Sequence, residues 1–308
     1  MNSTSLSDRR LICRSVIYMS ESSKAPKLAF LLLCTVSLLP FWPSLRSLAA
    51  LAIHDRRYSQ ILVIPLVSAC LIYWKRQDIF RGARWCPALG APLLCAGAAF
   101  YFLAVSLRLN PAEGLCLAAF AIVVTWMAGF VCCYGPQSFK AALFPLLFLL
   151  LLVPVPGGLL DGVISLLQKG SSEIVDFLFN VLGVPVFQDG YRFSLPGLTI
   201  EVAKECSSIR SATALFITGM VAGYLVIRSP WRRASLCAVT IPIAMFTNAV
   251  RIVTLSWLAI HVDRGFLYGN LHRRGGALFS LISVAILLLA LFVLSENRLR
   301  GRCSVSHG

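Results

Sequence analysis

One cysteine of the chain, Cys206, follows two charged residues and precedes a long apolar run, in the stretch EVAKECSSIRSATALF. A cysteine attacks as its thiolate, and its pKa falls beside cations and at the N-terminus of a helix. Both conditions are available, because Lys204 precedes Cys206 and Arg210 lies four residues after it, on the same face of the expected helix. The stretch therefore predicts a nucleophilic thiol. The alternatives are a structural cysteine at a helix start and a surface ion pair between Lys204 and Glu205.

Arg251 stands inside a second apolar run, MFTNAVRIVTLSWLAI, and Asn248 lies three residues before it on the same helix face. A charge within a membrane is costly unless it is paired or faces a polar cavity, so Arg251 is a candidate for a functional site. Such an arginine can stabilise the oxyanion of a tetrahedral intermediate or bind a substrate carboxylate. The alternative is a side chain that extends along the helix to the membrane surface.

His272 precedes the last apolar run of the chain. A histidine can accept the proton of a thiol and later donate it to a leaving amine. A thiol, a guanidinium and an imidazole at one depth of a membrane therefore predict acyl transfer from a peptide through a thioester. His272 is followed by Arg273 and Arg274, so a solvated loop residue is the alternative, and His261 and His54 remain candidates for the same role.

Membrane-spanning helices must position these side chains. The chain has 308 residues, a mean hydropathy of +0.79 and 13% charged residues, whereas soluble proteins carry about 25%. Uncharged runs of about twenty residues predict transmembrane helices. We therefore expect an all-α, polytopic membrane helical bundle with about eight spans, at residues 28–45, 59–74, 87–107, 112–134, 139–154, 208–227, 234–259 and 275–294.

The distribution of basic residues predicts the orientation of these spans. Lys and Arg gather near the N-terminus, in alternate connections and in the tail, and the positive-inside rule places these parts in the cytoplasm. In a cell inner membrane this puts Cys206, Arg251 and His272 at the outer face, because Arg251 lies 18 residues beyond Arg233, ~27 Å along a helix. We expect a cytoplasmic N-terminal segment (1–27), a transmembrane domain (28–295) and a cytoplasmic basic tail (296–308).

The connection 155–207 is longer than a simple loop, and long connections usually carry function. Apolar residues recur in it with helical spacing from Leu159 to Phe179, but interleaved polar residues leave no stretch that could span a membrane. We expect an amphipathic segment at the outer face, between the fifth and sixth spans. The stretch YRFSLPGLTIEVA then predicts extended chain with a turn at Pro196 and Gly197.

Charge and cysteine usage exclude several classes of partner. A net charge of +15 would suggest nucleic acid in a soluble protein, but here the basic residues lie in short loops, where they set topology. Most of the 11 cysteines lie in apolar runs, and neither a Cys-x-x-Cys pair nor a Cys/His cluster with zinc spacing occurs. We expect membrane lipid around the chain, and no nucleic acid, metal or cofactor.

Five stretches, in order along the chain, resemble motifs of the exosortase/archaeosortase family of proposed membrane cysteine transpeptidases. CSSIRS (206–211) is similar to the family's Cys-Ser-Gly-Ile-Arg-Ser element, NAVRI (248–252) to its Asn-x-x-Arg-Ile/Val element, and HRRGG (272–276) to its His-x-x-x-Gly element. HDRRYSQILVIP (54–65) resembles the family's Tyr-Ser-His-Gly entry to the second span, and PVP (154–156) resembles its Pro-x-Pro.

The resemblance implies that Cys206 is the nucleophile and that Arg251 and His272 are its partners. Supporting residues would be Asn248, Arg210 and Ser207. The implied substrates are secreted proteins with a C-terminal sorting signal of the PEP-CTERM type, made of a short motif, a membrane helix and a basic tail. The enzyme would cleave at the motif and transfer the new carboxyl end to an unidentified acceptor nucleophile, in a context of exopolysaccharide export.

Two positions depart from the family pattern. Ser208 replaces a glycine, which bears on how closely a substrate backbone approaches, and Gln60 stands where histidine is common. The competing function is a transporter or polysaccharide-assembly membrane protein without peptidase chemistry. Such a protein needs polar residues near mid-bilayer, whereas the polar residues here are expected at one face. A purely structural scaffold is the third possibility.

Overall fold

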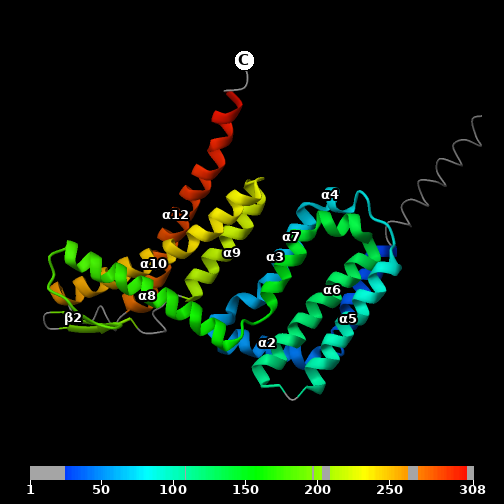
Figure 1. The fold of residues 1–308 in the computed structure, drawn as a ribbon, viewed down its shortest axis with the longest axis horizontal. Coiled ribbons are helices and arrows are strands. Elements are labelled where there is room, and N and C mark those ends of the chain that lie inside the picture. Colours follow the sequence, from blue (N-terminus) through cyan, green and yellow to red (C-terminus); the bar gives the residue numbers. More distant parts are fainter. Residues whose placement is uncertain (1–24, 108, 196–197, 203–208, 263–269, 304–308) are drawn as a thin grey trace, which may run out of the picture. The chain divides into compact units, whose positions relative to one another are not determined.

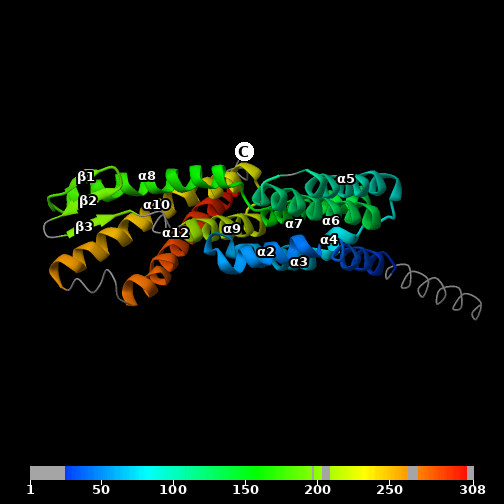
Figure 2. The same cartoon turned by 90° about the horizontal axis from the view of Figure 1, so that it is seen from below.

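The chain folds almost entirely into α-helices, as Figures 1 and 2 show. The computed structural model describes residues 25–107, 109–195, 198–202, 209–262 and 270–303, with backbone only for residues 56, 270–276 and 296–303. Within these ranges six helices are long and apolar enough to cross a membrane, and up to eight spans result if each of two bent helix pairs is taken as one. The prediction of an all-α, multi-span membrane protein is confirmed.

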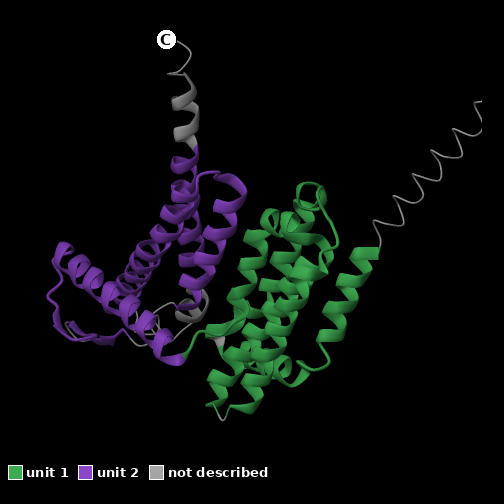
Figure 3. Cartoon of the chain, turned by 45° about the vertical axis from the view of Figure 1, so that its right-hand side comes forward, with its two compact units in different colours: residues 1–156 green, residues 157–308 purple. Residues whose placement is uncertain are grey.

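The chain divides into two compact units, Met1–Pro156 and Gly157–Gly308, which Figure 3 shows in different colours. The elements of the first unit are the helix Ala25–Ser37, α2 (Trp42–His54), η1 (Arg56–Leu62), α3 (Ile64–Trp74), α4 (Arg76–Phe80), α5 (Pro87–Ser106), α6 (Pro111–Ala141), α7 (Leu143–Phe148) and η2 (Leu149–Leu152). The second to fourth expected spans correspond to 57–74, α5 and the part of α6 before its kink.

Helix α6 supplies much of the core of the first unit. Its residues Val123, Phe130 and Tyr134 are buried, and the rings of Phe130 and Tyr134 lie 4.8 Å apart. The helix kinks at Gly135, where φ is +79° and a Cβ atom would lie 2.7 Å from the carbonyl oxygen of Arg84. A side chain there would therefore be strained, and the kink separates the expected fourth span from the helical residues of the fifth.

The first expected span, 28–45, is wrong at its C-terminal end. The first described helix ends at Ser37, and a second one, α2, begins at Trp42 and continues to His54. Two prolines explain the break: Pro40 lacks the backbone N–H that would continue the first helix, and Pro43 occupies the first turn of α2, where its fixed φ is favourable. Residues 46–54, which the expected spans place in the outer connection between the first and second spans, form most of the helix α2.

The second unit contains the remaining elements. These are α8 (Gly157–Val181), β1 (Phe187–Asp189), β2 (Arg192–Leu195), β3 (Leu198–Glu201), α9 (Ile209–Val226), α10 (Pro230–His261) and α12 (Asn270–Cys303). The sixth, seventh and eighth expected spans agree with α9, α10 and the window Ala277–Ser295 of α12 to within a few residues. These three helices pack around Leu215, Leu236 and Leu287, which are at most 3% exposed.

The amphipathic segment expected after residue 155 is the helix α8, whose 25 residues extend ~37 Å. One of its faces is buried and packs with α10, and Val175 and Phe179 of this face are fully buried. The stretch expected to be extended forms β2 and β3, to which β1 adds a third antiparallel strand. Phe193 and Leu195 of β2 pack against α8 and α10, so the small sheet covers this helix pair.

Candidate active site

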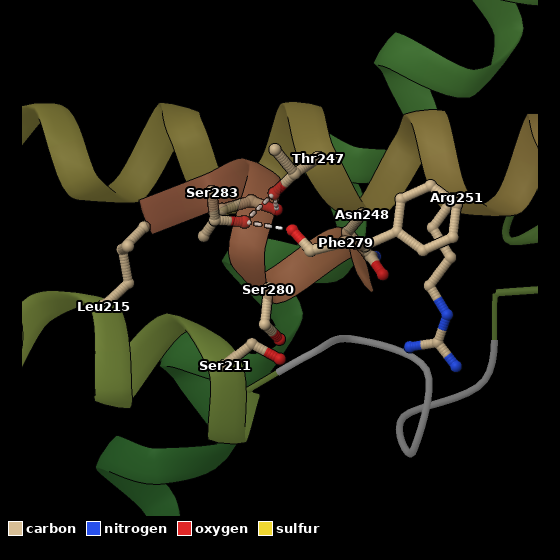
Figure 4. Close-up of a pocket in the computed structure, with 9 residues that line it drawn as sticks. Ser211, Leu215, Thr247, Asn248, Arg251, Phe279, Ser280 and Ser283 are labelled. Atoms are coloured by element: carbon tan, nitrogen blue, oxygen red, sulfur yellow. Dashed lines mark hydrogen bonds between the residues drawn. The ribbon is translucent and has the colours of Figure 1, made fainter. Parts of the chain in front are cut away.

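Helix α10 carries both polar residues that the sequence singles out within its span, Asn248 and Arg251, to the wall of one small pocket (Figure 4). The other walls come from α9 and α12. The cavity volume is about 20 Å³, which is room for one water molecule. Its polar lining consists of Ser211, Thr247, Asn248, Arg251, Ser280 and Ser283.

A hydrogen bond between two hydroxyl groups joins α12 to α10 at the floor of this pocket. Ser283 Oγ donates to Thr247 Oγ1 at 2.8 Å, and Thr247 Oγ1 donates to the carbonyl of Ile243 at 2.8 Å. Thr247 and Ser283 are each 5% exposed. The bond fixes how the two helices are aligned along their length. Arg251 lies one turn after Thr247 on α10, and Phe279 lies one turn before Ser283 on α12. Both of these residues line the same pocket.

Asn248 lies between the pocket and α8. Its side chain is 3% exposed, and its Nδ2 donates to Ser171 Oγ at 3.2 Å. A buried amide is costly without hydrogen-bond partners, so this bond holds the Asn248 side chain in one orientation. Asn248 thereby connects α8 to the turn of α10 that leads to Arg251.

Arg251 is half-buried, and Figure 4 shows its guanidinium group at the end of the pocket remote from Ser283 and Leu215. Arg210 is exposed on α9, while its neighbour Ser211 lines the pocket. Cys206 and Ser207 lie outside the described residues. His272 is in the first turns of α12, and its side chain is outside the described part. The meeting of Cys206, Arg251 and His272 therefore stays a prediction.

A family model described as Transmembrane exosortase (Exosortase_EpsH) matches residues 50–289 of the chain. This chain belongs to the exosortase family. The match includes all five stretches that resemble family motifs, and it covers the described pocket completely. Neither a curated protein nor a solved structure gives a match.

Two of the exosortase-like stretches meet in the first unit. Tyr58, from HDRRYSQILVIP, donates its hydroxyl to the carbonyl of Val155, in PVP, at 3.1 Å. Gln60, which stands where the family commonly has histidine, donates to the carbonyl of Arg57 in its own turn at 2.9 Å. The Arg57 side chain also donates to Asp55, and this hydrogen bond lowers the pKa of the Asp55 carboxyl below its usual value of 3.8.

The two alternative histidines are exposed at helix ends. His261, in the last turn of α10, stacks on Trp257 with ring centroids 4.6 Å apart, and its Nδ1 lies 3.0 Å from the Trp257 carbonyl. Ten residues separate it from Arg251, which is ~15 Å along the helix. His54 ends α2, with Nδ1 2.9 Å from the carbonyl of Ala50.

Sequence reasoning missed the hydroxyl residues of the exosortase pocket. Ser211 lies within the CSSIRS stretch, Thr247 directly precedes Asn248, and Ser280 and Ser283 lie three residues apart on α12. Serines and threonines in apolar helices are common, because they can bond to the carbonyl four residues back. Their spacing on helix faces was the available signal, but it does not say which helices meet.

The arrangement suits the stabilisation of negative charge. A guanidinium group and several hydroxyl groups line one small pocket, in which the dielectric constant is lower than in water. Donors that are already in place when charge develops stabilise a transition state without reorganising. The guanidinium group of Arg251 is the charged donor of this pocket, whereas the hydroxyl groups of Thr247 and Ser283 already donate to Ile243 and Thr247.

Proposed function

We propose that this exosortase-family chain is a membrane cysteine protease/transpeptidase that cleaves the C-terminal sorting signal of secreted proteins. The substrate signal would consist of a short motif, a membrane helix and a basic tail, as in PEP-CTERM proteins. The carboxyl end of the cleaved protein would pass through a thioester on Cys206 to an acceptor nucleophile, in the context of exopolysaccharide and cell-surface export. One observation carries the proposal: Ser211, five residues after Cys206, lines the same pocket as Asn248 and Arg251.

In the first chemical step, the Cys206 thiolate attacks the carbonyl carbon of the scissile peptide bond. Arg251 stabilises the oxyanion that forms on the carbonyl oxygen. When the tetrahedral intermediate collapses, the C–N bond breaks and the His272 imidazolium donates its proton to the leaving amine. The products are a thioester on Cys206 and the released membrane helix of the substrate.

In the second step, an amine, a hydroxyl or water attacks the thioester carbonyl. Neutral His272 accepts the proton of this nucleophile, the C–S bond breaks, and the Cys206 thiolate leaves. With an amine or hydroxyl acceptor the result is transfer, and with water it is hydrolysis. Arg251 stabilises the oxyanion of the second tetrahedral intermediate, as it does that of the first.

Chain connectivity supports a position of Cys206 near the pocket. Cys206 stands four positions after Val202 and five positions before Ser211. A chain advances at most ~3.6 Å per residue, so the Cys206 Cα atom lies within ~18 Å of that of Ser211. This limit is compatible with the proposed attack by the Cys206 thiol beside Arg251.

The orientation of the substrate follows from the same proposal. With both termini of the enzyme in the cytoplasm, the active site lies at the outer face of the inner membrane. A substrate helix would enter the bundle laterally, from the lipid, with its basic tail on the cytoplasmic side. Its recognition motif would then lie at the outer face, where the thiol is expected.

The decisive experiment replaces Cys206 in cells that co-express a tagged substrate with a motif, helix and basic tail. Cys206→Ala and Cys206→Ser are expected to abolish processing while the protein remains in the membrane. Cys237→Ala, on α10, is the matched control and is expected to leave processing intact, because Cys237 lies outside the pocket lining. Normal processing in both Cys206 variants would show that the nucleophile is wrong and would favour a transporter or assembly protein.

A further inference from the structure

One turn of α8 concentrates buried polar side chains on a face that is otherwise apolar. Gln168, Ser171 and Ser172 are 4%, 1% and 2% exposed, and they lie between the buried residues Leu167 and Val175. Burial of a polar group in a helix interface is costly unless it makes hydrogen bonds. The hydrogen bonds of these three side chains therefore show which parts of the chain this turn of α8 holds.

Gln168 holds the end of the small sheet. Its side-chain Nε2 donates to the carbonyl oxygen of Val202, the last described residue before the segment that contains Cys206. Val202 is itself 1% exposed, and its N–H donates to the carbonyl of Tyr191 at 2.9 Å. The peptide groups on both sides of Val202 are thus held, one by the sheet and the other by α8.

Ser171, one turn after Gln168, contacts Asn248, a residue of the pocket wall. Its Oγ accepts the hydrogen bond from Asn248 Nδ2 at 3.2 Å and lies 3.5 Å from the carbonyl of Met245, to which it donates. Ser172 Oγ donates to the carbonyl of Gln168 within α8 at 2.9 Å. A single helical turn therefore contacts both the strand that leads to Cys206 and the residue one turn before Arg251.

We propose that Gln168 is a positioning residue of this enzyme. Gln168 fixes the Val202 carbonyl, which is the point from which the chain continues to Cys206. One turn later on the same helix, Ser171 holds Asn248 of α10. Helix α8 thereby sets the position of Val202 relative to that turn of α10. The proposal rests on the function proposed above, and Gln168 itself touches no substrate. It assigns to α8 the task of holding Val202, at the end of β3, and Asn248, on α10, in one geometry.

The expected effect follows from the precision that catalysis requires. Loss of the Gln168 donor leaves a buried carbonyl without that partner and allows the end of β3 to shift. A misplacement of about 1 Å can lower a rate ~100-fold. We expect Gln168→Met, which has a similar volume and no donor, to lower kcat roughly 10- to 100-fold and to change KM much less.

The test uses the full chain, purified and reconstituted in liposomes, with the tagged substrate. Three quantities are measured: kcat and KM of processing, the amount of folded protein by size-exclusion chromatography, and the rate at which iodoacetamide alkylates Cys206. The alkylation rate is obtained by mass spectrometry of the peptide that contains Cys206. Gln188→Met is the matched control, because exposed Gln188 donates to Gly190 within its own turn at 2.9 Å.

A second variant keeps the proposal testable if Gln168→Met does not fold. In Gln168→Glu the side chain donates to Val202 only while its carboxyl group is protonated, and burial raises the pKa of a carboxyl. The ratio of its kcat to that of the wild type is therefore expected to be highest at about pH 5.5 and to fall by about pH 8.5. A ratio that stays constant between these two pH values would overturn the role of the hydrogen bond to Val202.

The outcomes separate this proposal from the proposed function. A lowered kcat and an altered alkylation rate in Gln168→Met, with Gln188→Met unchanged, support the positioning role. Values of both quantities within twofold of the wild type, in folded Gln168→Met protein, would overturn it even if Cys206→Ala is inactive. If Cys206→Ala still processes substrate but Gln168→Met alters the alkylation rate, the proposed function is wrong and the positional coupling stands.

Discussion

The hydroxyl pair Thr247–Ser283 offers a quantitative test of the helix register that forms the pocket. We consider Thr247→Val, Ser283→Ala and the double variant. Thr247→Val replaces the hydroxyl by a methyl group at nearly constant volume, and Ser283→Ala removes a single oxygen atom. Each change deletes the 2.8 Å hydrogen bond between α10 and α12 and leaves the buried helix contacts in place.

The structure sets the size of the effect. After Thr247→Val, Ser283 Oγ can still donate to the carbonyl of Phe279 at 2.9 Å, and after Ser283→Ala, Thr247 still donates to Ile243 at 2.8 Å. Neither single variant leaves a buried donor unpaired, so each should cost about 1 kcal/mol rather than the ~3 kcal/mol of an orphaned group. The double variant should cost about 0.5–1 kcal/mol less than the sum, in the range of interhelical hydrogen bonds in membranes.

The assay is the free energy of unfolding of the four proteins in mixed micelles, titrated with a denaturing detergent. Thr218→Val is the matched control, because exposed Thr218 makes the same bond to the carbonyl four residues back, at 2.8 Å, on α9. Its effect should be additive with that of Ser283→Ala. A coupling energy of zero between Thr247 and Ser283 would refute the register, and with it the placement of Arg251 beside Phe279.

Three further predictions follow from individual contacts. Arg251→Lys is expected to lower the processing rate by ~100-fold or more, because a point charge replaces the planar, multi-donor guanidinium at the proposed oxyanion site. Gly90→Ala is expected to destabilise the α5–α6 pair by about 1–3 kcal/mol, because its Cβ would lie 2.4 Å from that of Cys132, as detergent unfolding would measure. Asp55, whose pKa is lowered by Arg57, is expected to stabilise the chain at neutral pH by at most about 1 kcal/mol relative to Asp55→Asn.

Each of these predictions has its own control. Arg228→Lys, at an exposed site after α9, should leave processing unchanged. Gly162→Ala, where no atom lies within 4 Å of the added Cβ, should stabilise α8 by up to ~1 kcal/mol, so equal effects at Gly90 and Gly162 would contradict the packing argument. Because the folded-state pKa of Asp55 is lowered, its contribution is fully present above pH ~4 and is lost below it, as the pH falls through the lowered pKa of the folded state. An advantage that persists undiminished at pH ~2 would contradict the ion-pair account.

Most of the helices could be predicted from the sequence. Long apolar runs locate α5, α9, α10 and the apolar part of α12, because a helix needs about twenty apolar residues to cross the hydrocarbon core of a bilayer. The error at the first span has a local cause, since Pro40 and Pro43 divide what hydropathy alone presents as a continuous run. The kink at Gly135 falls at the boundary expected between the fourth and fifth spans, where Gly135 precedes Pro136, whereas its close approach to Arg84, 51 residues earlier in the chain, could not be read from the run itself.

The residues of the candidate site likewise fall into those that the sequence indicates and those that it does not. Asn248 and Arg251 were recognisable because a polar amide and a charge in an apolar helix are costly, and Tyr58 and PVP were recognisable by their resemblance to exosortase motifs. Gln168, Ser171 and Ser283 were not, because glutamine and serine are common in amphipathic and membrane helices. Their partners lie 34, 77 and 36 residues away in the chain.

The sequence by itself determined that the chain crosses a membrane several times, where α5, α9, α10 and the apolar part of α12 begin and end to within a few residues, and which two residues of α10 are too polar for lipid. These are local properties, because hydropathy, charge and proline act on the segment that contains them. Only the tertiary structure decided that Ser211, Asn248, Arg251 and Ser283 line one pocket, and that α8 reaches both Val202 and Asn248. Such contacts depend on which faces of distant helices pack together, and this is decided by the free energy of the whole unit and not by any single segment.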